Sequence, residues 1–259
     1  MLRDNFLFSK SSLLRYIQCP VSFYLQYCTD YGKIFRKLGE ASPHQERGTI
    51  LHQFFEEFNN GNDLTEIESM LCADKEYAKN IMNFYNILTE YKIGRAIKSE
   101  EKYVNDEKHV MGFIDAVYEF SDETCDIIMQ KFNVDRKRKT KKPESNIAII
   151  DYKTGKYHSY LQRKYEYELN FYVDLIESVT DYKVGYIGMM FTSEPYTFIL
   201  PVDKRKLNHD IEDFEKQKTS INNNEYKRIH SKLCGYCDFK HICDNYNDDI
   251  IEKATETYY

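Results

Sequence analysis

The sequence predicts an α/β fold, with a central sheet between a helical N-terminal part and a C-terminal helix. Three observations carry this prediction: a 3.6-residue apolar period before residue 95, strand-like segments from about residue 101, and renewed helical spacing over 203–222. With 259 residues and no internal repeat or Gly/Ser linker, the chain can bury one sizeable core. We therefore expect one domain, with a helical part (1–100), a catalytic sheet core (101–202) and a C-terminal helix with a cysteine cluster (203–259).

The N-terminal part is expected to be a helical layer or lid. Serines suited to capping begin the segment 11–27, and Pro20 breaks or restarts that helix. A second helix is indicated by apolar residues on one face between Ile50 and Phe58. The same period over 65–95 predicts one long helix or two shorter ones.

The central sheet is predicted from short apolar segments separated by polar, Lys-rich or Gly-containing turns. A helix over 159–178 and a hairpin across Glu194-Pro195 follow them. Four segments have the character of strands: 101–106, 109–120, 125–134 and 146–155.

Composition narrows the class of protein. A formal net charge of −6 argues against a protein that coats nucleic acid through bulk electrostatics. No stretch reaches the roughly 18 uncharged apolar residues of a membrane helix, and the N-terminus lacks the apolar run of a signal peptide. We therefore expect a soluble, intracellular protein, in which the 7 cysteines are not a disulfide framework.

Two aspartates and a lysine form the candidate catalytic group. Asp151 and Lys153 flank Tyr152 at the end of an apolar strand, so their side chains share one face. Asp115 lies inside another apolar segment, where an ionised carboxylate is costly without a partner or metal. Two such carboxylates could hold Mg²⁺ or Mn²⁺ for phosphodiester hydrolysis, and Lys153 could orient the attacking water. The alternative is that Asp151 and Lys153 form a buried ion pair with a structural role.

The segments GFIDAVYEF and AIIDYKTGK resemble motifs II and III of the RecB-like PD-(D/E)XK nucleases, and RGTILHQFFEEF is similar to an earlier family element. The resemblance implies a restriction-endonuclease-like mixed sheet flanked by helices. It also implies that His52 and the backbone carbonyl of Tyr152 bind the ion beside Asp115 and Asp151. By the sequence alone, His52 would more often be an ordinary histidine at a helix edge.

Two further groups are candidate substrate contacts. The family's Q-x-x-x-Y helix corresponds here to Glu168 and Tyr172, with Glu in place of Gln, so that Glu168 could repel phosphate or bind metal. Tyr172 faces substrate or belongs to the core. The basic run over 131–142 is either a solvated loop or a ribbon that contacts the DNA backbone through Lys137, Arg138, Lys139, Lys141 and Lys142.

The C-terminal cysteines have the spacing C-x2-C-x5-C, a tight arrangement of three soft ligands. In iron-sulfur RecB-like nucleases an upstream cysteine completes the set, and Cys19 matches its position. The resemblance thus implies a structural 4Fe-4S cluster that joins the N- and C-terminal segments. A structural Zn²⁺ completed by Cys19 or His241, or unligated thiols, are the alternatives. The three C-terminal ligands are Cys234, Cys237 and Cys243.

The resemblance extends from residue 11 to residue 243 and implies a Mg²⁺- or Mn²⁺-dependent deoxyribonuclease. We expect an exonuclease rather than an endonuclease, acting on single-stranded DNA in repair, recombination, replication or CRISPR adaptation, with a helicase or CRISPR-adaptation protein as possible partner. The alternatives are a non-catalytic DNA-end-binding or assembly subunit and a zinc-stapled binding module.

Overall fold

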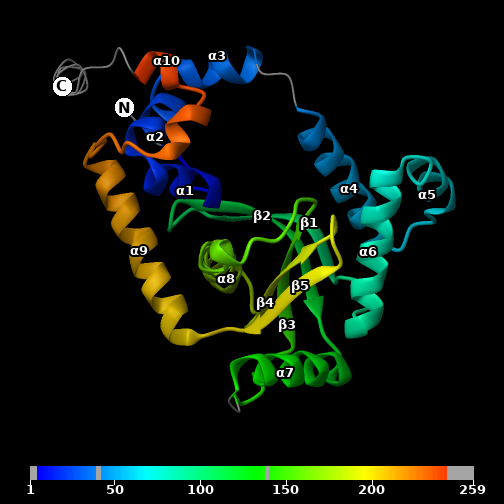
Figure 1. The fold of residues 1–259 in the computed structure, drawn as a ribbon. Helices are drawn as coiled ribbons and strands as arrows, with labels where there is room; N and C mark the ends of the chain where they lie inside the picture. Colours follow the sequence, from blue (N-terminus) through cyan, green and yellow to red (C-terminus); the bar gives the residue numbers. More distant parts are fainter. Residues whose placement is uncertain (1–4, 39–41, 138–139, 244–259) are drawn as a thin grey trace. The chain divides into compact units, whose positions relative to one another are not determined.

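The computed structural model describes residues 5–38, 42–137 and 140–243, which fall into two compact units (Figure 1). One unit takes its residues from Met1–Glu40, Asp106–Met111 and Ile211–Tyr259. The other, the sheet unit, takes them from Ala41–Asn105 and Gly112–Asp210. The single domain expected from the sequence stays a prediction.

A five-stranded mixed sheet forms the centre of the sheet unit (Figure 1). Its order follows the chain: β1 (Lys98–Asn105), β2 (Val110–Glu119), β3 (Ile147–Lys153), β4 (Val184–Phe191) and β5 (Tyr196–Pro201). Strands β2 and β3 are antiparallel, β3 and β4 are parallel, and β4 and β5 form the antiparallel hairpin expected across Glu194-Pro195. The predicted α/β class with a mixed central sheet is therefore confirmed.

Helices cover both faces of this sheet. The helices are α4 (Pro43–Asn59), α5 (Thr65–Leu71), α6 (Lys75–Tyr91), α7 (Asp122–Arg136) and α8 (Gln162–Val179), with a 3-10 turn η1 (Ser159–Leu161) before α8. Apolar side chains of α4, α6 and α7 share one buried cluster with Tyr118, Ile150 and Tyr152 of the sheet. Helix α8 contacts β1, β3 and β4. Because side chains alternate along a strand, Asp151 and Lys153 lie on the face opposite to Tyr152.

The strand expected over 125–134 was wrong, because this segment lies in helix α7. Ser121 caps the helix by accepting a hydrogen bond from the backbone N–H of Thr124. Four buried residues recur at helical spacing against the core cluster: Cys125, Ile128, Met129 and Phe132. The insertion between β2 and β3 is therefore not a ribbon, and the basic run follows the end of a helix.

The other expected elements are confirmed. The segment 65–95 forms two helices, α5 and α6, and the C-terminal helix is α9 (Lys204–Asn222), whose residues belong to both units. None of the helices in the described parts of the chain has the length and apolar character needed to cross a bilayer.

The first unit is built from short helices around aromatic side chains. Its helices are α1 (Lys10–Gln18), α2 (Pro20–Tyr27), α3 (Tyr31–Leu38) and α10 (Lys240–Cys243), with a 3-10 turn η2 (Lys232–Tyr236). Pro20 occupies the first turn of α2, where its missing N–H costs nothing. The ring of Tyr226 stacks on Phe23 with centroids 6.3 Å apart, and Tyr16 donates to the carbonyl of Glu225 at 2.6 Å.

Candidate active site

The candidate site lies where β2 and β3 cease to pair. Their register runs from Glu119 opposite Ile147 to Ala116 opposite Ile150. One step further along the strands, Asp115 and Asp151 point to the same face. At that step the backbone N–H of Tyr152 donates to the Asp115 carboxylate at 2.7 Å. A side chain thus takes the hydrogen bond that the strand ladder no longer supplies.

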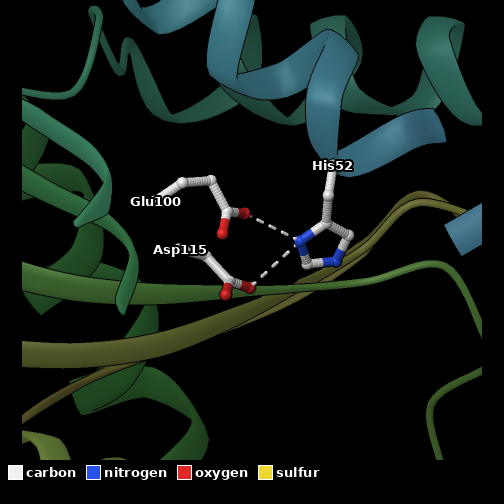
Figure 2. A group of neighbouring side chains, drawn as sticks. All are labelled: His52, Glu100 and Asp115. Carbon is white, nitrogen blue, oxygen red and sulfur yellow. Dashed lines mark hydrogen bonds and ion pairs between the residues drawn. The ribbon is translucent and has the colours of Figure 1, made fainter. Parts of the chain in front are cut away.

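His52 comes to this point from helix α4. Its Nε2 lies 3.1 Å from the carbonyl oxygen of Tyr152. Its Nδ1 lies 3.0 Å from Oε1 of Glu100 and 3.7 Å from Oδ2 of Asp115, and Figure 2 shows both carboxylates directed at that nitrogen. The structure therefore brings together His52, Asp115 and the Tyr152 carbonyl, three groups that the resemblance implied as ligands of the ion, while their binding of an ion stays a prediction.

Glu100 is a member of this group that the sequence analysis missed. It lies on β1 with a φ of 48°, a left-handed conformation that is uncommon for a residue with a side chain. Its neighbour Ser99 donates a hydrogen bond to the backbone carbonyl of Asp115 at 3.1 Å, which ties this part of β1 to the site. A two-residue alternation cannot reveal a position where the alternation is broken, so the sequence offered no clear signal for Glu100.

Lys153 is placed beside the second aspartate. Its Nζ lies 2.5 Å from Oδ2 of Asp151, whose side chain is 5% exposed, while that of Lys153 is 32% exposed. The ammonium thus offsets the charge of a nearly buried carboxylate and still reaches solvent. Both the predicted catalytic role and the ion-pair alternative for this pair are compatible with that contact.

Electrostatics in the site oppose the charged form of Asp115. Burial of its carboxyl and repulsion from Asp151 raise the pKa of Asp115 to about 7, although the charge of His52 opposes the shift. Burial alone lowers the pKa of His52, but the hydrogen bond to Glu100 and the surrounding carboxylates outweigh it and raise that pKa. A bound cation would relieve this accumulation of negative charge.

A buried polar network supports the site from the core side. The hydroxyls of Tyr118 and Tyr152 lie 2.6 Å apart, and the amide of Asn59 donates to the Tyr152 hydroxyl at 3.0 Å. Asn59 also accepts a hydrogen bond from the backbone N–H of Ala96 at 3.0 Å. Because Asn59 and His52 belong to the same helix, this network fixes α4 against the strands that carry the carboxylates.

The two predicted substrate residues of α8 are buried. Tyr172 is 7% exposed, and a Cβ added at Gly112 would meet its ring at 2.9 Å, so this tyrosine packs directly on strand β2. Glu168 is also 7% exposed, and its carboxylate lies 3.9 Å from Lys164. Their predicted contact with substrate stays a prediction.

The basic run is only partly described. Lys137 ends α7 in a left-handed conformation with a φ of 50°, and Arg138 and Lys139 lie outside the described residues. Lys141 is exposed. Lys142 instead contacts two carboxylates of α7, each at 3.0 Å, from Asp122 and Asp126.

The four predicted cluster cysteines all lie in the first unit. Cys19 joins α1 to α2, Cys234 lies in η2, Cys237 follows it, and Cys243 ends α10. All four are partly buried and none forms a disulfide. Between the last two cysteines, fully buried Phe239 contacts the guanidinium of Arg15, four residues before Cys19. The structure thus packs the C-terminal cysteine segment against the helix that leads to Cys19, while the cluster itself stays a prediction.

The donor atoms at the sheet site suit a divalent cation. Ligand atoms of His52, Glu100 and Asp115 lie within 4.8 Å of one another, the one such group of His, Cys, Asp and Glu found in the described residues. Carboxylate oxygens and an imidazole nitrogen are both donors that divalent metal ions accept in proteins. The residues present therefore fit a divalent ion at this site.

Comparisons with known proteins bear on the family and the fold of the chain. No curated protein matches the sequence. Among solved structures, the chain resembles a proposed exonuclease from Eubacterium rectale, with a TM-score of 0.52 and 12% identity over 90% of this chain and 88% of the other, which shows the shared fold. The family model described as the PD-(D/E)XK nuclease superfamily matches residues 7–244. Because that match covers most of the sequence, the chain belongs to the PD-(D/E)XK nuclease superfamily.

Proposed function

We propose that this nuclease hydrolyses DNA at the site formed by α4, β2 and β3, with a divalent ion held by His52, Asp115, Asp151 and the carbonyl of Tyr152. The observation that carries the proposal is the meeting of His52, Asp115 and the Tyr152 backbone at the point where β2 and β3 separate. Members of the superfamily are metal-dependent nucleases, and the group of His52, Glu100 and Asp115 at this site supports that chemistry.

The protein's own residues would divide the work of hydrolysis. A bound Mg²⁺ or Mn²⁺ would polarise the scissile phosphate and lower the pKa of an attacking water. Lys153, whose ammonium reaches solvent beside Asp151, would orient that water and stabilise charge that develops on the phosphate. Water adds to phosphorus as the bond to the leaving sugar oxygen breaks, so the attacking water gives up one proton and the leaving oxygen takes up one.

From the family resemblance we further propose single-stranded DNA as the substrate, exonucleolytic cleavage and Mg²⁺ or Mn²⁺ as the ion. A helicase or a CRISPR-adaptation protein would be the partner. The pathway would be repair, recombination, replication or CRISPR adaptation. Oligonucleotides blocked at either end test cleavage polarity and separate exonuclease from endonuclease action.

The direct test is metal-dependent release of nucleotides from labelled single-stranded DNA. Asp151→Ala and Lys153→Ala should each lower the rate by at least about 10³-fold, because both remove groups that act at the reacting phosphate. Asp181→Ala and Lys183→Ala are matched controls, because Lys183 precedes β4 at the end of the sheet opposite to Lys153. Full activity of either site variant would overturn the proposal, and DNA-end binding without cleavage by the wild type would favour a non-catalytic subunit.

We also propose that Cys19, Cys234, Cys237 and Cys243 hold a structural 4Fe-4S cluster. The spacing of the C-terminal cysteines and the contact between Arg15 and Phe239 support it. The cluster would stabilise the first unit and take no part in hydrolysis. A structural Zn²⁺ is the competing assignment.

A further inference from the structure

The carboxylate of Glu100 contacts the ring nitrogen of His52 that the proposed metal set does not need. We propose that Glu100 is a positioning residue, which holds the N–H of His52 Nδ1 and thereby directs the lone pair of Nε2 to the metal ion. This inference rests on the proposed function, because it takes His52 to be a ligand. It assigns the outer partner of that ligand, a position that no motif in the sequence indicates.

The surroundings of the two ring nitrogens decide where the single proton of a neutral imidazole lies. Nδ1 faces two carboxylates, Glu100 Oε1 at 3.0 Å and Asp115 Oδ2 at 3.7 Å. Nε2 faces one neutral acceptor, the carbonyl of Tyr152. A hydrogen bond to an ionised acceptor is roughly twice as strong as one to a neutral acceptor, so the proton favours Nδ1. Nε2 then carries the lone pair.

The spacing on the Nε2 side is that of two neighbouring ligands of one ion. In an octahedral ion with bonds of about 2.1 Å, adjacent ligand atoms are about 3.0 Å apart. Nε2 of His52 and the carbonyl oxygen of Tyr152 are separated by 3.1 Å. With the proton on Nδ1, Nε2 of His52 and the carbonyl oxygen of Tyr152 both present lone pairs, which repel each other. A cation bound by both atoms would remove that repulsion. Metal-binding histidines commonly give their other N–H to a carboxylate in this manner.

The backbone of β1 places Glu100 for this contact. The left-handed φ of 48° interrupts the strand's alternation at this residue. Ser99 is fixed on one side by its hydrogen bond to the carbonyl of Asp115. On the other side, Glu101 accepts a hydrogen bond from the hydroxyl of Tyr103 at 2.7 Å and pairs with Lys98. Neighbouring carboxylates on one strand therefore have different partners, and Glu101 is a natural control for Glu100.

The test compares metal binding by the full chain without DNA. Mn²⁺ affinity is measured by electron paramagnetic resonance for the wild type, Glu100→Ala, Glu100→Gln and Glu101→Ala. We expect Glu100→Ala to weaken binding by about 10- to 100-fold, because the imidazole loses its orientation. Glu100→Gln keeps an oxygen acceptor at the same place and should recover most of that loss. Glu101→Ala should bind Mn²⁺ like the wild type.

The proton position gives a second measurement that needs no metal. Long-range ¹H–¹⁵N correlation spectra of the His52 ring, recorded where the ring is neutral, should show Nδ1 protonated in the wild type and a shift of the proton toward Nε2 in Glu100→Ala. A proton on Nε2 in the wild type overturns the proposal. So does wild-type Mn²⁺ affinity in Glu100→Ala.

His52→Ala separates this inference from the function on which it rests. If His52→Ala binds Mn²⁺ as tightly as the wild type, His52 is not a ligand and the proposed metal set is wrong. If His52→Ala loses Mn²⁺ binding while Glu100→Ala keeps it, the metal set stands and only the positioning role of Glu100 fails.

Discussion

The sheet site and the cysteine segment are both candidate metal centres, and they are built in different ways. At the sheet site, His52, Glu100 and Asp115 are fixed by a long helix, by strands and by hydrogen bonds to the backbone. The cysteine segment consists of a five-residue 3-10 turn and a four-residue helix. Regular elements can hold ligands together before an ion binds. Short elements depend far more on the bound metal for their stability, so metal and folding are more tightly coupled there.

The largest expected effect is the loss of metal binding and stability when cysteines of the C-terminal segment are replaced. Replacing Cys234 and Cys237 by Ser should abolish the brown colour and visible absorption of protein purified without oxygen. It should also destabilise the first unit strongly, since structural metal sites contribute on the order of 10 kcal/mol. Hydrogen exchange should increase in the first unit and change little around His52. Exposed Cys72, replaced by Ser, is the matched control.

Two outcomes would contradict the cluster. A colourless wild-type protein with stoichiometric zinc would establish the zinc alternative. Unchanged absorption in the double variant would show that other residues bind the iron.

A smaller effect is expected from pH at the sheet site in metal-free protein. Because the pKa of Asp115 is raised to about 7 in the folded state, the folded chain keeps a proton that the unfolded chain releases from about pH 4 upward. Its contribution to the free energy of unfolding is thus present at low pH and is lost as pH rises to 7. Asp115→Asn should be more stable than wild type at pH 7.5, on the order of a few kcal/mol, and nearly equal at pH 4.

Thermal melts in chelator across that pH range measure this difference. Asp181→Asn, on an exposed turn of the same unit, should show no such trend. Saturating Mn²⁺ should reduce or reverse the advantage of Asp115→Asn, because only the wild type keeps the charged ligand. Equal stability of Asp115→Asn and wild type at both pH values would contradict the electrostatic account of the site.

The left-handed backbone of Glu100 predicts a difference in stability of about 1 kcal/mol between two variants at this position. Glu100→Gly and Glu100→Ala both remove the carboxylate, but only Gly adopts a φ of 48° without steric cost. Glu100→Gly should therefore be more stable than Glu100→Ala by about 1 kcal/mol in denaturant titrations. At Lys102 on the same strand the order should reverse, because Gly is there the poorer strand residue. The same order at both positions would show that the conformation of Glu100 carries no strain.

The smallest effect concerns the basic run. Lys141→Gln should weaken DNA binding a few-fold and reduce the slope of log K against log salt by about 1, as expected for one lost phosphate contact. Lys142→Gln is the matched control, because Asp122 and Asp126 already engage that ammonium. If DNA binding by the wild type and by Lys141→Gln depends equally on salt, Lys141 does not contact the DNA backbone.

Local patterns predicted much of the sheet and the face on which two residues of the candidate site lie. An apolar strand ending in Asp151 and Lys153 places both side chains on one face, because alternation follows from strand geometry alone. The apolar periods before residue 95 likewise predicted α4, α5 and α6, since a period of 3.6 residues is that of one helical turn. Helix α7 had the same kind of period, with capping Ser121 before it. Its β-branched residues Ile127, Ile128 and Val134 favour a strand only as an average tendency, which the helical packing of this segment overrides.

Patterns along the chain indicated candidate residues for chemistry, namely two aspartates, a lysine and a set of spaced cysteines, and the family resemblance added His52. The contacts that these residues make depend on the folded arrangement of the chain. Glu100, whose backbone is left-handed, contacts His52, and Lys142 pairs with the aspartates of α7. Tyr172 is buried against Gly112. These contacts join residues far apart in the chain or break a local alternation, so no pattern along the sequence encodes them.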